Sequence, residues 1–300
     1  MKEIVIISGK GGTGKTSIVA SFAALSNNAV LADCDVDAAD LHLILKPKIQ
    51  QENDFVGGKR ARIITEKCTG CGKCSELCRF DAIMCDNRGN GEQKLYEVEP
   101  VSCEGCGVCV EFCPADAIAF EDAVNGRWFI SETRFGPMVH AKLGIAEENS
   151  GKLVSVIRKE AKRIALEQRK ELVLVDGSPG IGCPVIASIT GADVVLIVTE
   201  PTMSAQHDFR RVAELAAHFN IPTLVCINKY DINEGISDEI ESQARESSIK
   251  TVGRIPYDTA VTKAQLQTQS VVEYSDNSIA QNITSVWENV LKILNHNLKY

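Results

Sequence analysis

A glycine-rich loop near the start of the chain constrains the fold more than any other feature. The stretch SGKGGTGKTS (8–17) contains Gly-x-x-x-x-Gly-Lys-Thr, directly after the apolar run EIVIIS (3–8) and at the start of a helical stretch (14–26). In such a loop, glycines let backbone N–H groups turn toward phosphate oxygens, and the helix N-terminus adds a favourable dipole. The chain therefore begins with the strand–loop–helix unit of an α/β nucleotide-binding domain.

The rest of the chain continues this alternation. Further strands are predicted at 28–33, 171–176, 193–199 and 222–227, and helices at 153–169, 184–190, 204–219 and 235–247. The strands are nearly continuous apolar runs, which are typical of parallel strands that are covered on both faces. The pattern predicts a P-loop NTPase fold, an α/β domain with a doubly wound, mainly parallel sheet.

A segment of different composition interrupts the alternation. Between about residues 57 and 121 the chain becomes rich in Cys, Gly and charged residues. Gly57–Gly58 is predicted to be a linker, and the Asp/Asn/Gly-rich stretch 86–91 an internal turn. We therefore expect a P-loop domain in two parts, 1–56 and 122–300, around an inserted domain, 57–121.

The insert holds eight of the twelve cysteines in two matching runs, CTGCGKCSELC and CEGCGVCVEFCP. Each run has the Cys-x2-Cys-x2-Cys-x3-Cys spacing of bacterial ferredoxins with two [4Fe–4S] clusters, in which the fourth cysteine ligates the other cluster. The expected ligand sets are Cys68, Cys71, Cys74 and Cys113 for one cluster, and Cys103, Cys106, Cys109 and Cys78 for the other. Zinc is the alternative, but zinc sites typically use two separated Cys-x2-Cys pairs. The insert is therefore predicted to be an α+β ferredoxin domain.

Other positions near these runs carry separate expectations. Arg79 stands where ferredoxins usually have a proline after the fourth cysteine. Cys85 is expected to be a small buried side chain, and Cys226 to lie in the core. Cys183 has two open interpretations: an ordinary thiol that opens a helix, or a metal or redox ligand between two subunits.

The loop contains a second lysine, Lys10, that phosphate binding does not require. At this point the sequence resembles the deviant-Walker ATPases of the MinD/ParA/nitrogenase-iron-protein class, whose loop reads KGGxGK[ST]. The resemblance implies that Lys10 reaches the nucleotide of a second subunit, so that MgATP holds a homodimer together. Lys15 should neutralise the β- and γ-phosphates, and Thr16 should ligate Mg²⁺. The residues expected to hold the nucleotide are Gly9, Gly11, Gly12, Thr13, Gly14, Lys15, Thr16 and Ser17.

Three more segments resemble parts of this family's site. LADCDVDAADLH (31–42) resembles the first switch, in which Asp35 would position the attacking water and Asp33 would lie beside the Mg²⁺ shell. In LVLVDGSPGIG (172–182), Asp176 would hold Mg²⁺ through water, and Gly177–Gly182 would form the second switch.

The third segment is CINKYD (226–231). Its Asn228, Lys229 and Asp231 have the form NKxD, which reads guanine in GTPases, whereas the similar ATPases place an Asn near adenine. We favour ATP, with GTP as the alternative.

Charge and hydropathy exclude some partners. The net charge of −8 argues against nucleic acid as the main partner. No apolar run reaches the ~18 residues of a membrane span, and no signal peptide is recognisable, so a cytoplasmic location is expected. The apolar stripe of the last helix, from Ile279 to Leu294, is expected to pack in the core and not on a membrane.

Taken together, the chain resembles MinD-superfamily ATPases that carry an inserted ferredoxin domain. This resemblance implies an ATPase whose dimer and switch cycle gates electron transfer through two [4Fe–4S] clusters to a partner protein. One alternative is an ATP-dependent protein that assembles or carries an Fe–S or other metal cofactor. Another is a positioning ATPase that uses the clusters as a redox sensor. The expected partner is a redox or metal-cofactor-assembly protein.

Overall fold

The structure is a computed structural model that describes residues 1–86, 94–144 and 150–296. The chain forms two compact units. The first consists of Met1–Asn53, Trp128–Lys142 and the segment from Ser150 onward. The second consists of Asp54–Arg127 and a short segment that begins at Leu143. The predicted insert, 57–121, lies within the second unit.

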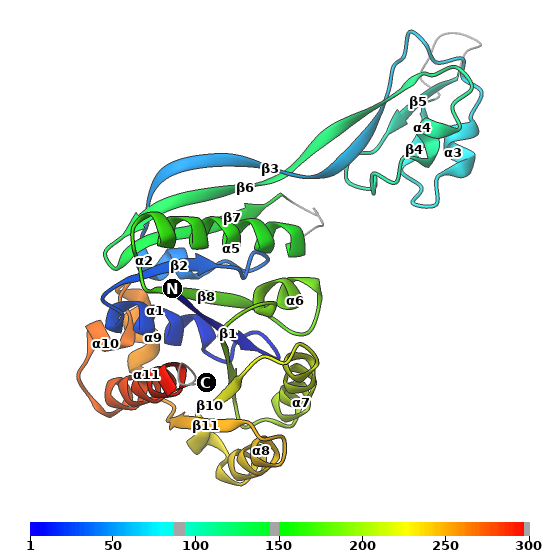
Figure 1. Cartoon of the computed structure of the whole chain (residues 1–300). Coiled ribbons are helices and arrows are strands. Elements are labelled where there is room, and N and C mark those ends of the chain that lie inside the picture. The colour runs from blue at the N-terminus through cyan, green and yellow to red at the C-terminus, as the bar shows by residue number, and fades with distance from the viewer. Residues whose placement is uncertain (87–93, 145–149, 297–300) are drawn as a thin grey trace. The chain divides into compact units, whose positions relative to one another are not determined.

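The first unit is built around a mostly parallel sheet (Figure 1). In the described part of the chain, the strand order is β11-β10-β9-β1-β8-β2-β7-β6-β3. Its parallel core consists of β1 (Lys2–Ser8), β2 (Ala29–Asp33), β8 (Leu172–Pro179), β9 (Val194–Thr199), β10 (Thr223–Asn228) and β11 (Lys250–Ile255). Five of these strands are confirmed predictions, with ends that differ by no more than three residues. β11 was not predicted.

The helices follow the strands in the alternation that the sequence predicted. The predicted ones are α1 (Lys15–Leu25), α5 (Ser150–Glu167), α6 (Cys183–Ile189), α7 (Met203–His218) and α8 (Glu234–Glu246). The shorter elements are α2 (Leu41–Leu45) and the 3-10 turn η1 (Tyr230–Ile232). The chain then continues through α9 (Ala260–Leu266), α10 (Val271–Tyr274) and α11 (Ser278–His296).

Three further strands extend the sheet beyond β2. β7 (Gly136–Leu143) pairs parallel with β2, and β6 (Ile118–Thr133) and β3 (Lys48–Ile63) follow it. The predicted linker at Gly57–Gly58 is wrong, because both glycines lie inside β3. The Gly57 N–H donates to Asn125 Oδ1 of β6 at 2.9 Å, and a Cβ at Gly57 would come within 2.7 Å of that oxygen. Glycine is required there for close strand pairing.

The second unit contains α3 (Lys73–Leu77), β4 (Ile83–Asp86), β5 (Leu95–Val98) and α4 (Val108–Glu111), together with parts of β3 and β6. β4 and β5 form an antiparallel pair. Its small buried core consists of Ala61, Ile83, Val98 and Ile118, with five of the motif cysteines packed against it. Of the predicted turn at 86–91, Asp86 ends β4 and the other residues lie outside the described ones.

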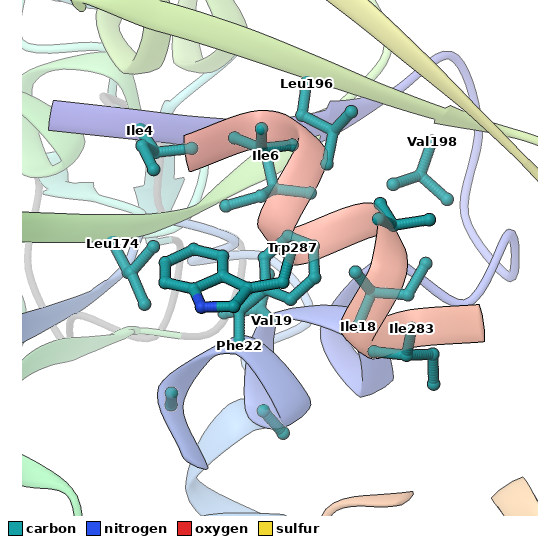
Figure 2. Close-up of a cluster of buried hydrophobic side chains, with 14 of the residues drawn as sticks. Ile4, Ile6, Ile18, Val19, Phe22, Leu174, Leu196, Val198, Ile283 and Trp287 are labelled. Carbon is teal, nitrogen blue, oxygen red and sulfur yellow. The ribbon is translucent and has the colours of Figure 1, made fainter. Parts of the chain in front are cut away.

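The main core lies between the sheet and helices α1 and α11. Figure 2 shows Trp287 of α11 beside Phe22 of α1, with Ile4 and Ile6 of β1 nearby. The ring centroids of Trp287 and Phe22 are 4.9 Å apart. The next residue of β1 after Ile4, Val5, is also fully buried, so both faces of the sheet are covered. The predicted core packing of α11 is confirmed. No described helix has the length and apolar character needed to cross a membrane.

Candidate functional site

The glycine-rich loop joins β1 to α1, as the sequence predicted. Gly12 and Gly14 have φ values of 81° and 88°, in the left-handed region that favours glycine. A Cβ at Gly14 would lie 2.3 Å from Nδ2 of Asn228, which donates to the Thr13 carbonyl at 2.7 Å. The end of β10 therefore braces the loop from the side.

Four ionisable side chains meet beneath the loop. The Lys15 ammonium lies 2.5 Å from Asp176 Oδ1 and 3.2 Å from Asp35 Oδ2. Asp33 ends β2 directly beside Asp176 of β8 in the strand register. The strand ends therefore bring the predicted switch carboxylates to the predicted phosphate-binding lysine.

Burial dominates the electrostatics of this cluster. It raises the pKa of Asp33 well above its usual value, and the negative charge of Asp176 adds to this effect. Burial likewise raises the pKa of Asp35. Burial alone would lower the pKa of Lys15, but the charges of Asp176 and Asp35 outweigh it and raise the pKa. Lys15 is therefore a buried cation among carboxylates that repel one another.

Some oxygens in this cluster and in the loop above it have no hydrogen-bond partner in the described part of the chain. They are Thr13 Oγ1, Asp33 Oδ2 and Asp176 Oδ2, and all three are buried. Buried oxygens without a partner are rare and need an explanation. Hard carboxylate and hydroxyl oxygens suit a Mg²⁺ ion and its waters. Thr16, the predicted Mg²⁺ ligand, is half-buried at the second position of α1.

Lys10, the second lysine of the loop, has its partners within its own chain. Its ammonium lies 2.8 Å from Glu200 Oε1, and the other oxygen of that carboxylate lies 2.9 Å from the ammonium of Lys229. Sequence reasoning missed Glu200, which follows β9 in a loop and belongs to no motif. The one signal in the sequence was its position directly after the strand β9, because the carboxyl ends of parallel strands form the edge of the sheet where ligands bind.

A pocket of about 740 Å³, including its open mouth, lies beside Gly12 and Gly14. Of the three residues expected to contact the nucleotide, Asn228 and Lys229 line this pocket, whereas Asp231 is not among the lining residues. The Asp231 carboxylate instead accepts the backbone N–H of Tyr257 at 2.7 Å. The opposite wall comes from residues 255–265 and from helices α10 and α11. It carries no motif, so the sequence did not predict it.

The two predicted switch segments contact one another. The Cys34 N–H donates to the Asp176 carbonyl at 2.8 Å, and the Ser178 hydroxyl donates to the Cys34 carbonyl at 2.7 Å. The second switch was expected to be a turn from Gly177 onward, but β8 continues to Pro179, and only 180–182 lie outside strand and helix. Cys183 is exposed and is the first residue of α6.

The eight motif cysteines line two separate cavities in the second unit. One cavity, of about 340 Å³ including its open mouth, is lined by Cys68, Cys71, Cys74 and Cys113. The other, of about 380 Å³, is lined by Cys78, Cys103, Cys106 and Cys109. Each cavity thus combines the first three cysteines of one run with the last cysteine of the other.

The two cavities share details that follow the sequence repeat. The Ala82 N–H donates to Cys78 Sγ and the Ala117 N–H to Cys113 Sγ, each at 3.4 Å and four residues after its cysteine. Burial raises the pKa of the Cys74 thiol, and the neighbouring Cys68 and Cys113 add to the effect. Thiolates at these positions would therefore gain from a shared cation.

Two other cysteines test the earlier expectations. Cys85 is exposed, so the prediction that it is buried is wrong; it stands on β4 of a two-stranded pair with too few neighbours to cover it. Cys226 is fully buried in β10 as predicted, and burial raises its pKa to about 12. Among the described residues, no three or more Cys, His, Asp or Glu side chains are gathered closely enough to hold a single metal ion.

Comparisons with known proteins agree with the fold. Residues 4–271 match the family described as the CobQ/CobB/MinD/ParA nucleotide binding domain. The chain is 38% identical to the uncharacterized protein MJ0578 of Methanocaldococcus jannaschii over 235 residues, covering 77% of this chain and 79% of that one. It is 28% identical to MJ0579 of the same organism, covering 92% and 94%.

The fold is also similar to that of the septum site-determining protein MinD from Pyrococcus horikoshii, solved with Mg-ADP. The TM-score is 0.57 at 16% identity, covering 100% of this chain and 99% of that one. Because the family match spans most of the chain and agrees with the loop, the strand order and the carboxylates beneath the loop, this chain belongs to the CobQ/CobB/MinD/ParA family of P-loop ATPases.

Proposed function

We propose that this chain is a nucleotide-dependent dimeric ATPase whose switch cycle gates electron transfer through two [4Fe–4S] clusters to a partner protein. The observation that carries the redox part is the division of eight cysteines into two cavities with three ligands from one run and one from the other. When bound, such clusters supply one-electron transfer.

The donor set of each cavity suits a cluster better than a single ion. Four thiolates on one zinc ion, with Zn–S bonds of about 2.3 Å, would be gathered tightly around one point. A four-iron cube is a larger body whose four ligands stand farther apart at its corners. The cavities hold four sulfur ligands each, and the N–H···S bonds from Ala82 and Ala117 would stabilise thiolate charge at Cys78 and Cys113.

On the ATPase side, the nucleotide must rearrange the buried ion pairs of Lys15. Phosphate oxygens would replace Asp176 and Asp35 as its partners. Asp176, one oxygen of which has no partner among the described residues, would then be free to hold Mg²⁺ through water. Asp35 would be free to orient the attacking water. The switches would thus have two arrangements, one with Lys15 paired to Asp176 and Asp35 and one with Lys15 paired to phosphate, and a bound γ-phosphate would favour the second.

The first switch has a covalent route to the cysteine unit. It leads through α2 into β3, and β3 continues into the second unit. His42 of α2 stacks on His140 of β7, with ring centroids 6.3 Å apart. His140 in turn stacks on Phe129 of β6, with ring centroids 5.1 Å apart. β6 begins at Ile118, shortly after Cys113. A movement of α2 would therefore act on two strands that carry the cysteine unit.

The pocket beside the loop supports ATP as the nucleotide. In an NKxD motif that reads guanine, the aspartate accepts from two donors of the base. Here an oxygen of Asp231 already accepts the Tyr257 N–H. Competition between MgATP and MgGTP for the protein should favour ATP, and tighter binding of GTP would contradict this assignment.

A second candidate is an ATP-dependent protein that delivers an Fe–S or other metal cofactor. The observation that favours it is the exposure of Cys71 and Cys106, one in each cavity, because an acceptor thiol would be able to reach them. Transfer of iron and sulfide to an apo-ferredoxin, dependent on MgATP, would support this candidate over electron transfer.

The assignment of two [4Fe–4S] clusters is tested by measuring the iron and sulfide content of the protein. Anaerobically purified protein should contain about eight iron and eight sulfide ions per chain, the content of two four-iron clusters. Cys113→Ser should lower both values, whereas Cys85→Ser, on β4 outside the cavities, should leave them unchanged. Bound zinc in place of iron would reject the redox proposal.

Gating is tested by cluster EPR spectra and potentials recorded with and without MgATP. A shift that is absent in Lys15→Ala would show communication between nucleotide and cysteine unit, and identical spectra would reject gating. Dimerisation is tested by sedimentation with MgATP, in which wild type should dimerise and Lys10→Ala should remain monomeric.

A further inference from the structure

Glu200 lies between β9 and α7, and the proposed function assigns it no role. Its side chain is only 14% exposed, and its carboxylate joins two lysines of the nucleotide site. Oε1 lies 2.8 Å from Lys10 and Oε2 lies 2.9 Å from Lys229. Burial raises the pKa of Glu200, but hydrogen bonds from the two ammonium groups and their charges outweigh burial and lower it. Glu200 is therefore an ionised bridge between two cations.

The Lys10 ammonium is saturated where it lies. A lysine ammonium has three N–H donors. Besides Glu200, Lys10 Nζ reaches Thr202 Oγ1 at 3.1 Å and Ser204 Oγ at 3.2 Å. All three acceptors belong to the same short segment at the start of α7. Lys10 has no N–H left for an acceptor outside its own chain in this arrangement.

Lys229 extends the bridge to the phosphate loop. Its ammonium donates to the Gly12 carbonyl at 2.9 Å as well as to Glu200. An entering γ-phosphate brings negative charge close to this loop, and that charge competes with the Glu200 carboxylate for the same cations. Because Glu200 binds both lysines, a phosphate bound in the loop would weaken the hold of Glu200 on Lys10.

The geometry points to Glu200 as a positioning residue that holds Lys10 within its own subunit until a nucleoside triphosphate competes for the lysine. This inference rests on the proposed nucleotide-dependent dimer. Dimerisation requires that Lys10 leave Glu200, which costs free energy. Glu200 therefore raises the MgATP concentration at which half of the protein is dimeric. The bridge would also suppress association without nucleotide.

The test compares Glu200→Gln with a matched control, Glu214→Gln. Glutamine keeps the size of the side chain but removes the charge, and Glu214 is an exposed residue of α7. Glu200→Gln should lower the MgATP concentration at half-maximal dimerisation about tenfold, the difference between a charged and a neutral hydrogen bond. Ser204→Ala should shift it in the same direction by less, and Glu214→Gln should not shift it.

A second readout does not depend on dimerisation. Without nucleotide, acetylation of Lys10 by acetic anhydride, measured by mass spectrometry relative to exposed Lys263, should be slow in wild type and faster in Glu200→Gln. Equal rates in the two proteins would overturn the inference. Faster acetylation with an unchanged MgATP midpoint would also overturn it.

The failures of the two proposals are distinguishable. If wild type never dimerises but Glu200→Gln accelerates acetylation, the dimer proposal fails while Glu200 still holds Lys10. A Lys10→Ala/Glu200→Gln double variant separates the role of Lys229. Any residual association of Lys10→Ala should not change on adding Glu200→Gln, and a tenfold gain there would assign the effect to Lys229 and overturn the inference.

Discussion

The ammonium of Lys15 and the carboxylate of Asp176 lie 2.5 Å apart beneath the phosphate loop, with side chains only 6% and 1% exposed. A buried ion pair is a poor source of net stability, because desolvation offsets most of the attraction. It is, however, costly to break by removing one partner. The pair therefore ties α1 to β8 without nucleotide, at the place where phosphate and Mg²⁺ must enter.

Lys15→Ala should affect binding and stability together. MgATP affinity should fall by at least ~100-fold, because a charged phosphate contact of about 3 kcal/mol is lost. The free energy of unfolding should also fall, by about 3 kcal/mol, because the variant leaves buried carboxylates without their cation. Calorimetric titration and urea unfolding measure the two effects. Lys263→Ala, at an exposed position of α9, should change neither, and wild-type ATP affinity in Lys15→Ala would contradict the site.

Two glycines of the loop should respond differently to alanine. Gly14 has a φ of 88°, and a Cβ there would lie 2.3 Å from Asn228 Nδ2, so Gly14→Ala should displace Asn228. We expect a loss of roughly 1–3 kcal/mol in unfolding free energy from the strained φ and the lost hydrogen bond. No atom of the described residues lies within 4 Å of a Cβ at Gly11, and Gly11→Ala should be neutral for unfolding without nucleotide. Equal losses in thermal or urea unfolding would refute this contrast.

The parts of the fold that the sequence predicted are those whose physics is local. Residues 8–17 specify a phosphate loop because strand, glycines, lysine and helix start must be consecutive. Buried parallel strands such as β8 and β9 read as apolar runs. β3 has no such run, because it is an edge strand whose side chains are mostly exposed. Its Gly57 makes room for Asn125 of β6, a strand that is adjacent in the sheet but far away in the sequence.

The candidate site shows the same division. Lys15, Asp35 and Asp176 were assigned from motifs and do meet in space. Glu200 and the wall at 255–265 were missed, since only the folding of β9 and β11 against β10 brings them to the loop. The grouping of each cysteine cavity was predictable because both runs have the spacing of bacterial two-cluster ferredoxins, in which the fourth cysteine of one run joins the first three of the other.

The contact between Trp287 and Phe22 should be a main support of α11. Trp287 is 5% exposed and belongs to the core between α1 and the sheet. Trp287→Ala should lower the free energy of unfolding by roughly 3–5 kcal/mol, through lost burial and the cavity left behind. Leu266→Ala removes an apolar side chain that is 80% exposed and should cost little. Urea unfolding compares them, and similar losses would mean that α11 does not anchor the core.

His140 should make stability depend on pH. Its imidazole is buried against Phe129, its Nε2 lies 2.9 Å from Ser131 Oγ, and burial, with a smaller effect of His42, lowers its pKa from 6.5 to about 4. Between these values the unfolded chain binds a proton that the folded chain does not. Stability should therefore rise with pH across this window and be lost as pH falls from 6.5 toward 4.

The size of this effect follows from the shift. A change of about 2.5 in pKa corresponds to about 3 kcal/mol of unfolding free energy between pH 7 and pH 4. His140→Gln keeps a polar group near Ser131 but cannot titrate, so its stability should depend less on pH by this amount. Urea unfolding at pH 7, 5.5 and 4 measures the difference between the variant and wild type. His207→Gln, which removes an exposed imidazole of α7 far from this core, is the matched control. If His140→Gln also follows wild type, the imidazole is not held neutral between α2 and the two strands, and the stack cannot serve as a rigid connection from the first switch to β6.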